Sequence, residues 1–416
     1  MNSDSYKETE IGLIPEDWKI DILGNVTEKI TKGTTPTTLG KNFVDIGINF
    51  IKAESIRDDS SFIKNKFMHI DSDTNELLER SILEINDILF SIAGVIGRTA
   101  IVTNNILPAN TNQAIAIIRP NLDLILPKFL KYYLSTQRFN EVVKSRIVQT
   151  AQANVSLSVL SNSPVILPDL IEQSIITNIL FSLDKKIQLN HQMNQTLESI
   201  GQAISEMGEI PEGWKVIENI AEICDLINYG YTQSASENRV GPKFLRVMDI
   251  NKGDWINWES VPYCEIEVKK FLKYRLERGD IVIARMADPG KVAIFESDID
   301  AVFASYLIRI RLLNPKLSLY LYYLMKSPYY QFYIVGASSG TVQNNLNAKG
   351  LTKGLPIVIP NENIIESFNV NIGLLREKIN VNIKENQNLS QIRDSLLPKL
   401  MSGKIRVKTT EEAIAK

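Results

Sequence analysis

The sequence has 416 residues, of which 44% are hydrophobic and 23% are charged, and its formal net charge is −2. These ordinary globular values exclude a disordered or collagen-like chain, and the length favours two or three domains. The near-neutral charge gives no sign of a nucleic-acid partner, so such a partner has to be inferred from local features.

The composition also bears on where the protein works. No stretch approaches the roughly 18 consecutive apolar residues of a membrane span, and the first residues lack the apolar core of a secretion signal. Cys224 and Cys264 are the only cysteines, so a disulfide framework is excluded. We therefore expect a protein of the cytoplasm, where thiols stay reduced.

An internal repeat organises the chain. The segment 14–19 (IPEDWK) returns at 210–215 as IPEGWK. Three further short motifs return in the same order, from 86–89 to 279–282, from 132–134 to 322–324, and from 164–168 to 356–360. This period far exceeds that of a solenoid unit, so we infer one architecture that is used twice.

The first part of each copy reads as a mixed domain. Short apolar runs bounded by Gly, Asn, Asp and Pro predict strands, and they lie at 85–92, 114–118, 281–284 and 307–310. Helices are predicted at 127–135 and 319–325. We expect these mixed α+β domains at 1–168 and 207–360.

The second part of each copy predicts a long helix. From Ile176, and again from Phe368, the seam residues recur at alternating steps of four and three. This heptad pattern is typical of helices that supercoil around a partner, and buried Asn at such positions fixes their register. The predicted seam contains Ile176, Leu180, Leu183, Ile187, Asn190, Asn194 and Leu197 in the first helix, and Leu375, Ile379, Asn382, Asn386 and Leu389 in the second.

The two helices are expected to form an antiparallel coiled coil with a pseudo-two-fold internal repeat. The register that sets Asn190 against Asn386 also sets Asn194 against Asn382. A parallel register would match the Asn residues as well, but the short connections favour the antiparallel one. As an alternative, each amphipathic helix packs only on its own domain. We place the helices at 169–206 and 361–405, followed by a C-terminal tail at 406–416.

Motifs of catalysis are missing from the sequence. It has no Gly-rich loop of nucleotide-hydrolysing enzymes. Its only histidines are His69 and His191, and no pair of histidines or cysteines has metal-site spacing. The segment 288–291 (DPGK) resembles a methyltransferase motif but lacks the aromatic residue that holds a flipped base, so we interpret it as a turn. We expect neither a catalytic residue nor a metal site.

Several of these motifs together carry a family resemblance. The repeated IPE-x-WK segments, the segment 167–173 (LPDLIEQ) that opens the first helix and the segment 400–405 (LMSGKI) that closes the second resemble the specificity subunit of type I restriction–modification enzymes. The resemblance covers essentially the whole chain, including the order domain, helix, domain, helix. The second copy departs from the family pattern at 359–364, where it reads IPNENI.

The resemblance implies a non-enzymatic, DNA-binding specificity subunit. Its two mixed α/β domains would be target-recognition domains, each reading one half of a split sequence in double-stranded DNA. The helices would space the domains and dock two modification subunits, which methylate adenine with S-adenosylmethionine. Restriction subunits would add cleavage that uses ATP and Mg. The resemblance implies none of these cofactors in this chain, and no membrane.

Polar loops that could contact bases or phosphates are the candidate DNA-binding sites. In the first domain the candidates are Lys32, Thr34, Thr35, Lys52, Ser91, Gly94, Arg98, Thr111, Asn112, Gln113, Gln152 and Asn154. In the second they are Tyr229, Tyr231, Thr232, Arg246, Asp249, Arg285, Lys291, Ser305, Tyr306, Thr341, Gln343 and Asn344. Residues 269–291 add seven basic side chains against three acidic ones. Any of these residues can equally be present because it stabilises a turn or a hydrogen-bonded loop.

Two other classes of function stay open at this point. A two-headed protein-binding scaffold without a DNA role would use the same helices to space two partners, and the near-neutral charge suits it. An enzyme with an unrecognised site is the second alternative, and the missing motifs weigh against it. Protection of a split DNA sequence by the chain with its modification subunits would discriminate them.

Overall fold

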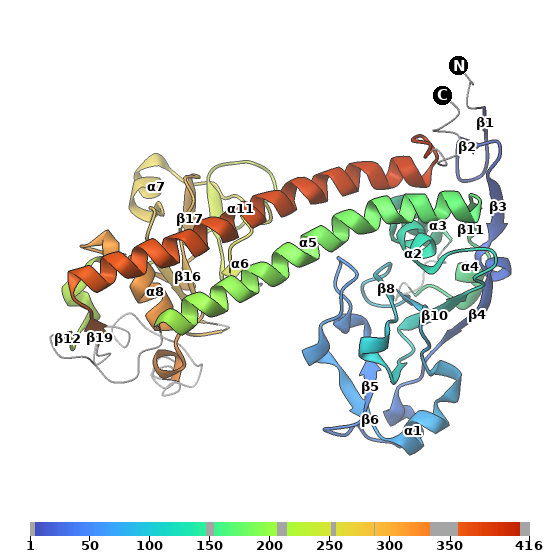
Figure 1. Ribbon diagram of the computed structural model, residues 1–416, viewed down its shortest axis with the longest axis horizontal. Helices are drawn as coiled ribbons and strands as arrows, with labels where there is room; N and C mark the ends of the chain where they lie inside the picture. The colour runs from blue at the N-terminus through green and yellow to red at the C-terminus, as the bar shows by residue number, and fades with distance from the viewer. Residues whose placement is uncertain are drawn as a thin grey trace. The chain divides into compact units, whose positions relative to one another are not determined.

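The computed structural model describes residues 5–146, 154–205, 214–250, 255–286, 288–332 and 357–407 (Figure 1). The chain divides into two compact units, which comprise residues 1–186 with 388–416, and residues 187–387. Each unit contains one mixed domain and a segment of each of two long helices, α5 (Leu170–Ser205) and α11 (Glu362–Met401). None of the described helices combines the length and the apolar composition that crossing a membrane requires.

The first domain is built on a four-stranded antiparallel sheet. Its order is β4 (Thr27–Lys32), β10 (Ile115–Pro120), β7 (Ile88–Ser91) and β8 (Thr99–Ile101). A second sheet has the order β6 (Met68–Ile70), β5 (Ile48–Ile51) and β9 (Ala109–Thr111), with β5 and β9 parallel. The helices are α1 (Ser72–Leu77), α2 (Pro127–Ser135), α3 (Gln137–Ser145) and α4 (Leu157–Ser161).

The central sheet is covered on both of its faces. Since successive residues of a strand point to opposite faces, neighbours such as Leu89 and Phe90 enter different cores. On one face Phe90 packs with Phe129 of α2 and makes an edge-to-face contact with Phe139 of α3. On the other face Leu89 packs with Ile51 of the second sheet. Burial on both faces explains why β7 reads as an apolar run instead of an alternating pattern.

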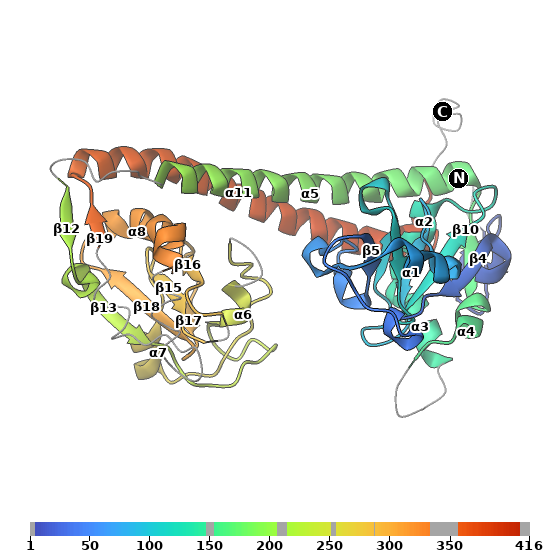
Figure 2. The ribbon, with the colours of Figure 1, turned by 90° about the horizontal axis from the view of Figure 1, so that it is seen from below.

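The second domain repeats this plan (Figure 2). Its central sheet has the order β13 (Cys224–Tyr229), β18 (Leu307–Leu312), β15 (Ile281–Ala284) and β16 (Val292–Ile294). Strands β14 (Lys243–Leu245) and β17 (Ala301–Phe303) pair in parallel, as β5 and β9 do. The helices are α6 (Val247–Ile250), α7 (Val268–Tyr274) and α8 (Ser318–Lys326). The same strand order in both domains confirms the predicted internal repeat.

The remaining elements are short. Strands β1 (Tyr6–Lys7) and β2 (Ile14–Pro15) pair with each other, as do β3 (Lys19–Ile22) with β11 (Pro164–Leu167), and β12 (Lys215–Ile217) with β19 (Ile357–Ile359). The 3₁₀ helices are η1 (Leu23–Val26), η2 (Pro36–Leu39), η3 (Ala53–Ser55), η4 (Lys64–Lys66), η5 (Glu79–Ser81), η6 (Asn104–Ile106), η7 (Ile220–Ile223) and η8 (Pro315–Leu317). The repeated motifs at 164–168 and 356–360 thus include the strands that precede the long helices.

An acidic residue in the repeated motif holds the start of a central strand. Asp87 accepts two hydrogen bonds from Arg119 at 2.8 and 3.0 Å. In the second copy Asp280 accepts two from Arg311, both at 2.8 Å. The predicted strand at 85–92 starts only at residue 88, because Asn86 takes a left-handed conformation, with φ at 72°, in the turn before it.

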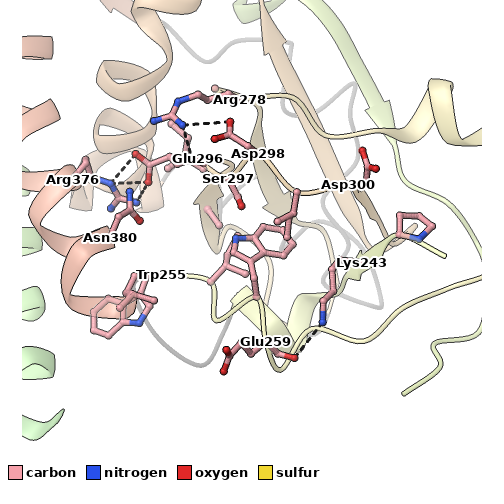
Figure 3. Close-up of a pocket in the computed structure, with 18 of the residues that line it drawn as sticks. Lys243, Trp255, Glu259, Arg278, Glu296, Ser297, Asp298, Asp300, Arg376 and Asn380 are labelled. Atoms are coloured by element: carbon pink, nitrogen blue, oxygen red, sulfur yellow. Dashed lines mark hydrogen bonds and ion pairs between the residues drawn. The ribbon is translucent and has the colours of Figure 1, made fainter. Parts of the chain in front are cut away.

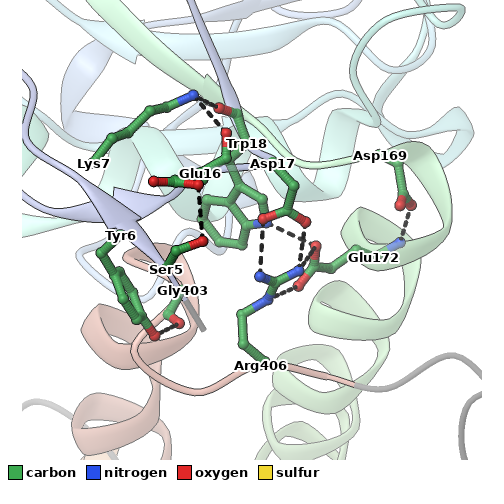
Figure 4. A network of polar contacts seen from close by, with 10 residues as sticks. All are labelled: Ser5, Tyr6, Lys7, Glu16, Asp17, Trp18, Asp169, Glu172, Gly403 and Arg406. Atoms are coloured by element: carbon green, nitrogen blue, oxygen red, sulfur yellow. Dashed lines mark hydrogen bonds and ion pairs between the residues drawn. The ribbon is translucent and has the colours of Figure 1, made fainter. Parts of the chain in front are cut away.

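Polar contacts tie the end of α11 to the beginning of the chain within the first unit (Figure 4). The Trp18 indole N–H donates to buried Glu172 at 2.7 Å. Arg406 donates to the same carboxylate at 3.1 Å and to Asp17 at 2.7 and 3.0 Å. These contacts bring the WK, LPDLIEQ and LMSGKI segments together, and they show that the predicted tail begins as a packed segment.

The end of α11 differs from the prediction of residue 405. The helix ends at Met401, and Gly403 takes a left-handed conformation with φ at 69°. The Gly403 N–H donates to the Leu400 carbonyl, and the Ile405 N–H donates to the Lys399 carbonyl. A left-handed glycine that satisfies the last carbonyls is a common way to terminate a helix.

The two long helices pair in the antiparallel direction that the short connections favour. In the second unit Asn190 donates to Asn386 Oδ1 at 2.8 Å, and Asn382 donates to Asn194 Oδ1 at 2.7 Å. All four amides are buried. In the first unit the Ile176 and Leu180 side chains belong to the same core as Leu400. The helices also pack on their domains, since a side chain at Gly201 would come within 2.7 Å of the Tyr323 ring.

Candidate nucleic-acid interface

The candidate loops of the first domain gather at one edge of its central sheet. The last residue of β4, Lys32, pairs with Ala116 near the start of β10, and the last residue of β7, Ser91, pairs with Ile115. The loops after β4 and β7 and the loop before β10 therefore leave the sheet side by side. Lys52 comes directly after β5, whose last residue, Ile51, pairs with Thr111 at the end of β9. Since the loop before β10 begins at this point, Lys52 lies at the same edge. We call this set of loops the first edge.

Hydrogen bonds hold the loops of the first edge to one another. Gln113 Oε1 accepts from the backbone N–H of Thr35 at 3.1 Å and from its hydroxyl at 2.5 Å. The Thr34 hydroxyl accepts from Arg80 at 3.3 Å. Gly33 lies so close to the Thr111 carbonyl that a Cβ would stand 1.7 Å from its oxygen, so only glycine fits here. The edge is a defined surface of joined loops.

Two candidates of the first domain are fully buried, so the prediction that they contact DNA is wrong for them. Ser91 donates to the Val95 carbonyl at 2.5 Å and accepts from the Arg98 N–H at 2.8 Å. The Thr111 hydroxyl donates to the Ile51 carbonyl at 2.8 Å. Both side chains hold the loops in place, because they point into the domain at the ends of their strands.

The other candidates of the first domain remain at the surface to different degrees. Lys32, Gly94, Gln113 and Asn154 are exposed, while Thr34, Thr35, Lys52, Arg98 and Asn112 are half-buried. Arg98 forms an ion pair with Asp58 at 2.7 Å. The Lys52 ammonium lies 4.9 Å from the centre of the Phe43 ring, and Asn112 accepts from the Ala114 N–H at 3.2 Å. Gln152 lies outside the described residues.

The second domain gathers its candidates at the equivalent edge. Tyr229 ends β13 and pairs with Ile308, while Ala284 ends β15 and pairs with Leu307. The loops that carry Tyr231 with Thr232, Arg285 with Lys291, and Ser305 with Tyr306 therefore leave this sheet together. We call this set the second edge.

Aromatic and basic side chains form the surface of the second edge. The Arg285 guanidinium lies 4.5 Å from the centre of the Tyr229 ring, and the Arg285 N–H donates to the Tyr306 carbonyl at 3.0 Å. Tyr306 is 56% exposed, and Thr232 is exposed as well. Tyr231, Lys291 and Ser305 are half-buried. A planar cation beside aromatic rings suits bases and phosphates alike.

The predicted role of Asp249 is wrong, because the residue is only 4% exposed and its carboxylate is held by Arg246. Arg246 donates to both oxygens of Asp249 at 3.0 Å, and these hydrogen bonds raise the pKa of the guanidinium. This ion pair occupies Arg246 within its own loop. The candidates Thr341, Gln343 and Asn344 lie outside the described residues.

The basic residues of the run at 269–291 do not all lie at the second edge. The Lys270 ammonium lies 6.0 Å from the centre of the Tyr231 ring at the second edge. Arg275 instead forms an ion pair with Asp300, and Arg278 forms one with Asp298. Aspartates outside the run therefore offset part of the positive charge that the sequence suggested.

Both cysteines of the chain lie among the described residues. Burial raises the pKa of the Cys224 thiol to about 12 and that of Cys264 to about 11, so both remain protonated at neutral pH. No group of three His, Cys, Asp or Glu side chains among the described residues could hold a metal ion.

A groove of about 1780 Å³ lies in the second unit between the domain and α11 (Figure 3). Trp255, Trp258 and Tyr263 line it from the domain side, and Arg376 lines it from α11. Arg376 is buried and binds Glu296. The sequence alone does not single out this arginine, because its partner lies 80 residues away and no periodic pattern relates the two.

A comparison with protein families adds an independent observation. Two copies of the type I restriction modification DNA specificity domain match this chain, at residues 15–199 and 211–384. The two matches coincide with the two copies of the internal repeat.

Individual relatives resemble the chain over nearly its whole length. The type I restriction enzyme MjaIX specificity subunit of Methanocaldococcus jannaschii is 26% identical over 97% of this chain and 96% of that protein. The HindI specificity subunit of Haemophilus influenzae is 24% identical over 94% of this chain and all of that protein. The crystal structure of the S subunit of a type I restriction–modification system from M. genitalium has a TM-score of 0.54 at 16% identity, covering 94% of this chain and 97% of that one. This likeness supports the fold.

Proposed function

The chain belongs to the type I restriction modification DNA specificity family, and from this premise we propose that it reads a split target in double-stranded DNA, one half-site with each domain. The observation that carries the proposal is the recurrence of one surface in both domains. Each central sheet collects its polar loops at the same edge, although the residues of the two edges differ. One scaffold with two different surfaces suits the reading of two different half-sites.

The chemistry of the edges supports contact with DNA. Lys32 and Gln113 at the first edge can bind phosphate and base edges, and Arg285 at the second can bind guanine or phosphate. Tyr229 and Tyr306 add flat surfaces against sugars and bases. Lys270 beside the second edge adds positive charge, and such charge supplies most of the non-specific affinity for DNA.

The outer surfaces of α5 and α11 support a docking role for two modification subunits. In the second unit Leu189, Met193 and Ile200 of α5 are exposed by 43–49%, although they lie outside the seam. Leu374 and Val381 of α11 are exposed by 63% and 52%. Exposed apolar residues one or two turns apart on a helix form a stripe that suits a partner helix.

We assign the chemistry of modification and restriction to partner subunits. This chain would choose the sequence, and S-adenosylmethionine, ATP and Mg would act on the modification and restriction subunits.

Methylated sequences in cells that carry the chain with its modification subunits test the proposal. Lys32→Ala should relax or abolish the reading of one half-site, and Arg285→Ala that of the other, while the second half-site stays unchanged in each case. Lys29→Ala in the middle of β4 and Arg278→Ala before β15 are matched controls, because neither residue lies at the end of its strand that forms the edge.

The results can contradict the proposal in two ways. If both edge variants keep the wild-type sequence while the controls change it, the reading surface lies elsewhere. If the complex with modification subunits protects no DNA sequence, the protein-binding scaffold replaces the proposal.

A further inference from the structure

Charged residues of the two long helices break the internal repeat at one position. Equivalent positions of α5 and α11 lie 192 residues apart, as Asn190 and Asn382 do. Asp184 of α5 therefore occupies the position of Arg376 in α11. The repeat keeps the Asn residues of the seam but reverses the charge here.

Each of these residues pairs with an opposite charge on the other helix. In the first unit the Arg393 guanidinium lies 2.9 Å from the Asp184 carboxylate, and both side chains are about a quarter exposed. In the second unit Arg376 pairs with Glu198, and these side chains are 6% and 4% exposed. Helix α5 thus supplies the carboxylate of both ion pairs, and α11 supplies both guanidinium groups.

Equivalent tyrosines anchor each ion pair to the neighbouring domain. The Tyr132 hydroxyl of α2 donates to Asp184 at 2.6 Å. The ring of Tyr322 in α8 lies 5.4 Å from the Arg376 guanidinium, which also binds Glu296 (Figure 3). These contacts hold the charges in place, so the pairs cannot easily rearrange to suit another partner helix.

The internal repeat makes a second kind of pairing conceivable between two copies of the chain. Since the seams of α5 and α11 are equivalent, α5 could pair with α5 of another copy in the same register, and α11 with α11. Within one chain Glu198 faces Arg376. In a pair of two α5 helices, Glu198 would face the residue at the equivalent position of the other copy, which is Asp184. In the α11 pair, Arg393 would face the other copy's Arg376. Like charges at these positions beside the seam, which are buried or half-buried in this chain, would repel each other.

We propose that Asp184, Glu198, Arg376 and Arg393 make α5 and α11 select each other and reject a second helix of their own kind. The chain then closes on its own helices instead of assembling with another copy through like helices. The apolar and Asn residues of the seam cannot supply this selectivity, because they are nearly the same in both helices.

The full chain with reversed charges tests this proposal. In E198R/R393E like helices become complementary across two copies, because the new arginine would face Asp184 and the new glutamate would face Arg376. Pairing within one chain would instead oppose two carboxylates at one end of the seam and two guanidinium groups at the other. Light scattering coupled to size-exclusion chromatography should give 46.9 kDa for the wild type and twice that mass for this variant. Two differently tagged copies of the variant should copurify.

The variant D184R/R393E is a matched control with the same net charge. It keeps both pairs complementary within one chain, since only the polarity of the Asp184–Arg393 pair is reversed. Because pairing within a chain benefits from a high effective concentration, this control should keep the single-chain mass at micromolar concentration.

A second self-pairing variant keeps the test decisive if E198R/R393E does not fold. D184R/R376E reaches the same complementarity between like helices through the other two residues, and it should also double the mass. The proposal is overturned if a folded self-pairing variant, with the helical circular dichroism of the wild type, keeps the single-chain mass. It is equally overturned if the wild type or the control dimerises as these variants do.

Discussion

Replacing Asn194 by Leu tests the polar centre of the helix pair. The Asn194 amide oxygen accepts the Asn382 hydrogen bond at 2.7 Å, and both side chains are fully buried. Asn382 Oδ1 has no hydrogen-bond partner among the described residues, so Asn194→Leu strands the whole Asn382 amide. A buried donor without an acceptor costs about 1–3 kcal/mol, and we expect the free energy of unfolding to fall by that amount.

The reverse substitution should cost less. In Asn382→Leu, Asn194 keeps its hydrogen bond to the Ile379 carbonyl at 3.4 Å, and the unpaired oxygen of Asn382 disappears. The double variant replaces the pair by apolar seam residues and should be as stable as the wild type or more so. Urea unfolding followed by helical circular dichroism measures all four proteins in one double-mutant cycle. A double variant that loses the sum of the two single losses would refute the reasoning.

Three further predictions concern single side chains. Trp18→Phe removes the donor at 2.7 Å from buried Glu172 and should lower stability by about 1.5–3 kcal/mol, the range for hydrogen bonds to charged groups, in thermal melts. Gly403→Ala should detach the end of α11 and make it sensitive to limited proteolysis, because the new Cβ would stand 2.3 Å from Pro15 and φ is 69°. Cys224, whose pKa burial raises to about 12, should resist alkylation at pH 8 in the folded protein and react once urea unfolds it, as mass spectrometry can measure.

The helix pair was the part of the fold that could be predicted best from sequence. The steps of four and three continue without a break along each helix, and the Asn residues fix the register because a slip separates their amides. The end of α11 was misplaced because the pattern does not show that Gly403 turns left-handed. The parallel pairing of β5 with β9 was not predicted, since it joins segments such as Asn49 and Ala109 that are distant in sequence.

The candidate interface was predictable as a set of loops but not side chain by side chain. Turn composition locates the loops, and the strand register then explains why they share an edge. Ser91 and Thr111 are buried because they stand at strand ends that point inward, which composition does not reveal. Arg376 and Arg406 could not be predicted, because each binds a carboxylate that is distant in the sequence.

The most direct test of the account is the methylated sequence in cells whose chain carries a relative's domain in place of residues 207–360. The modification subunits and the first domain stay unchanged. We predict that one half of the methylated target changes to that of the relative, while the other half and the spacing between them are retained. Methylation in which both halves change, or in which neither changes, would contradict the claim that each domain reads its own half-site.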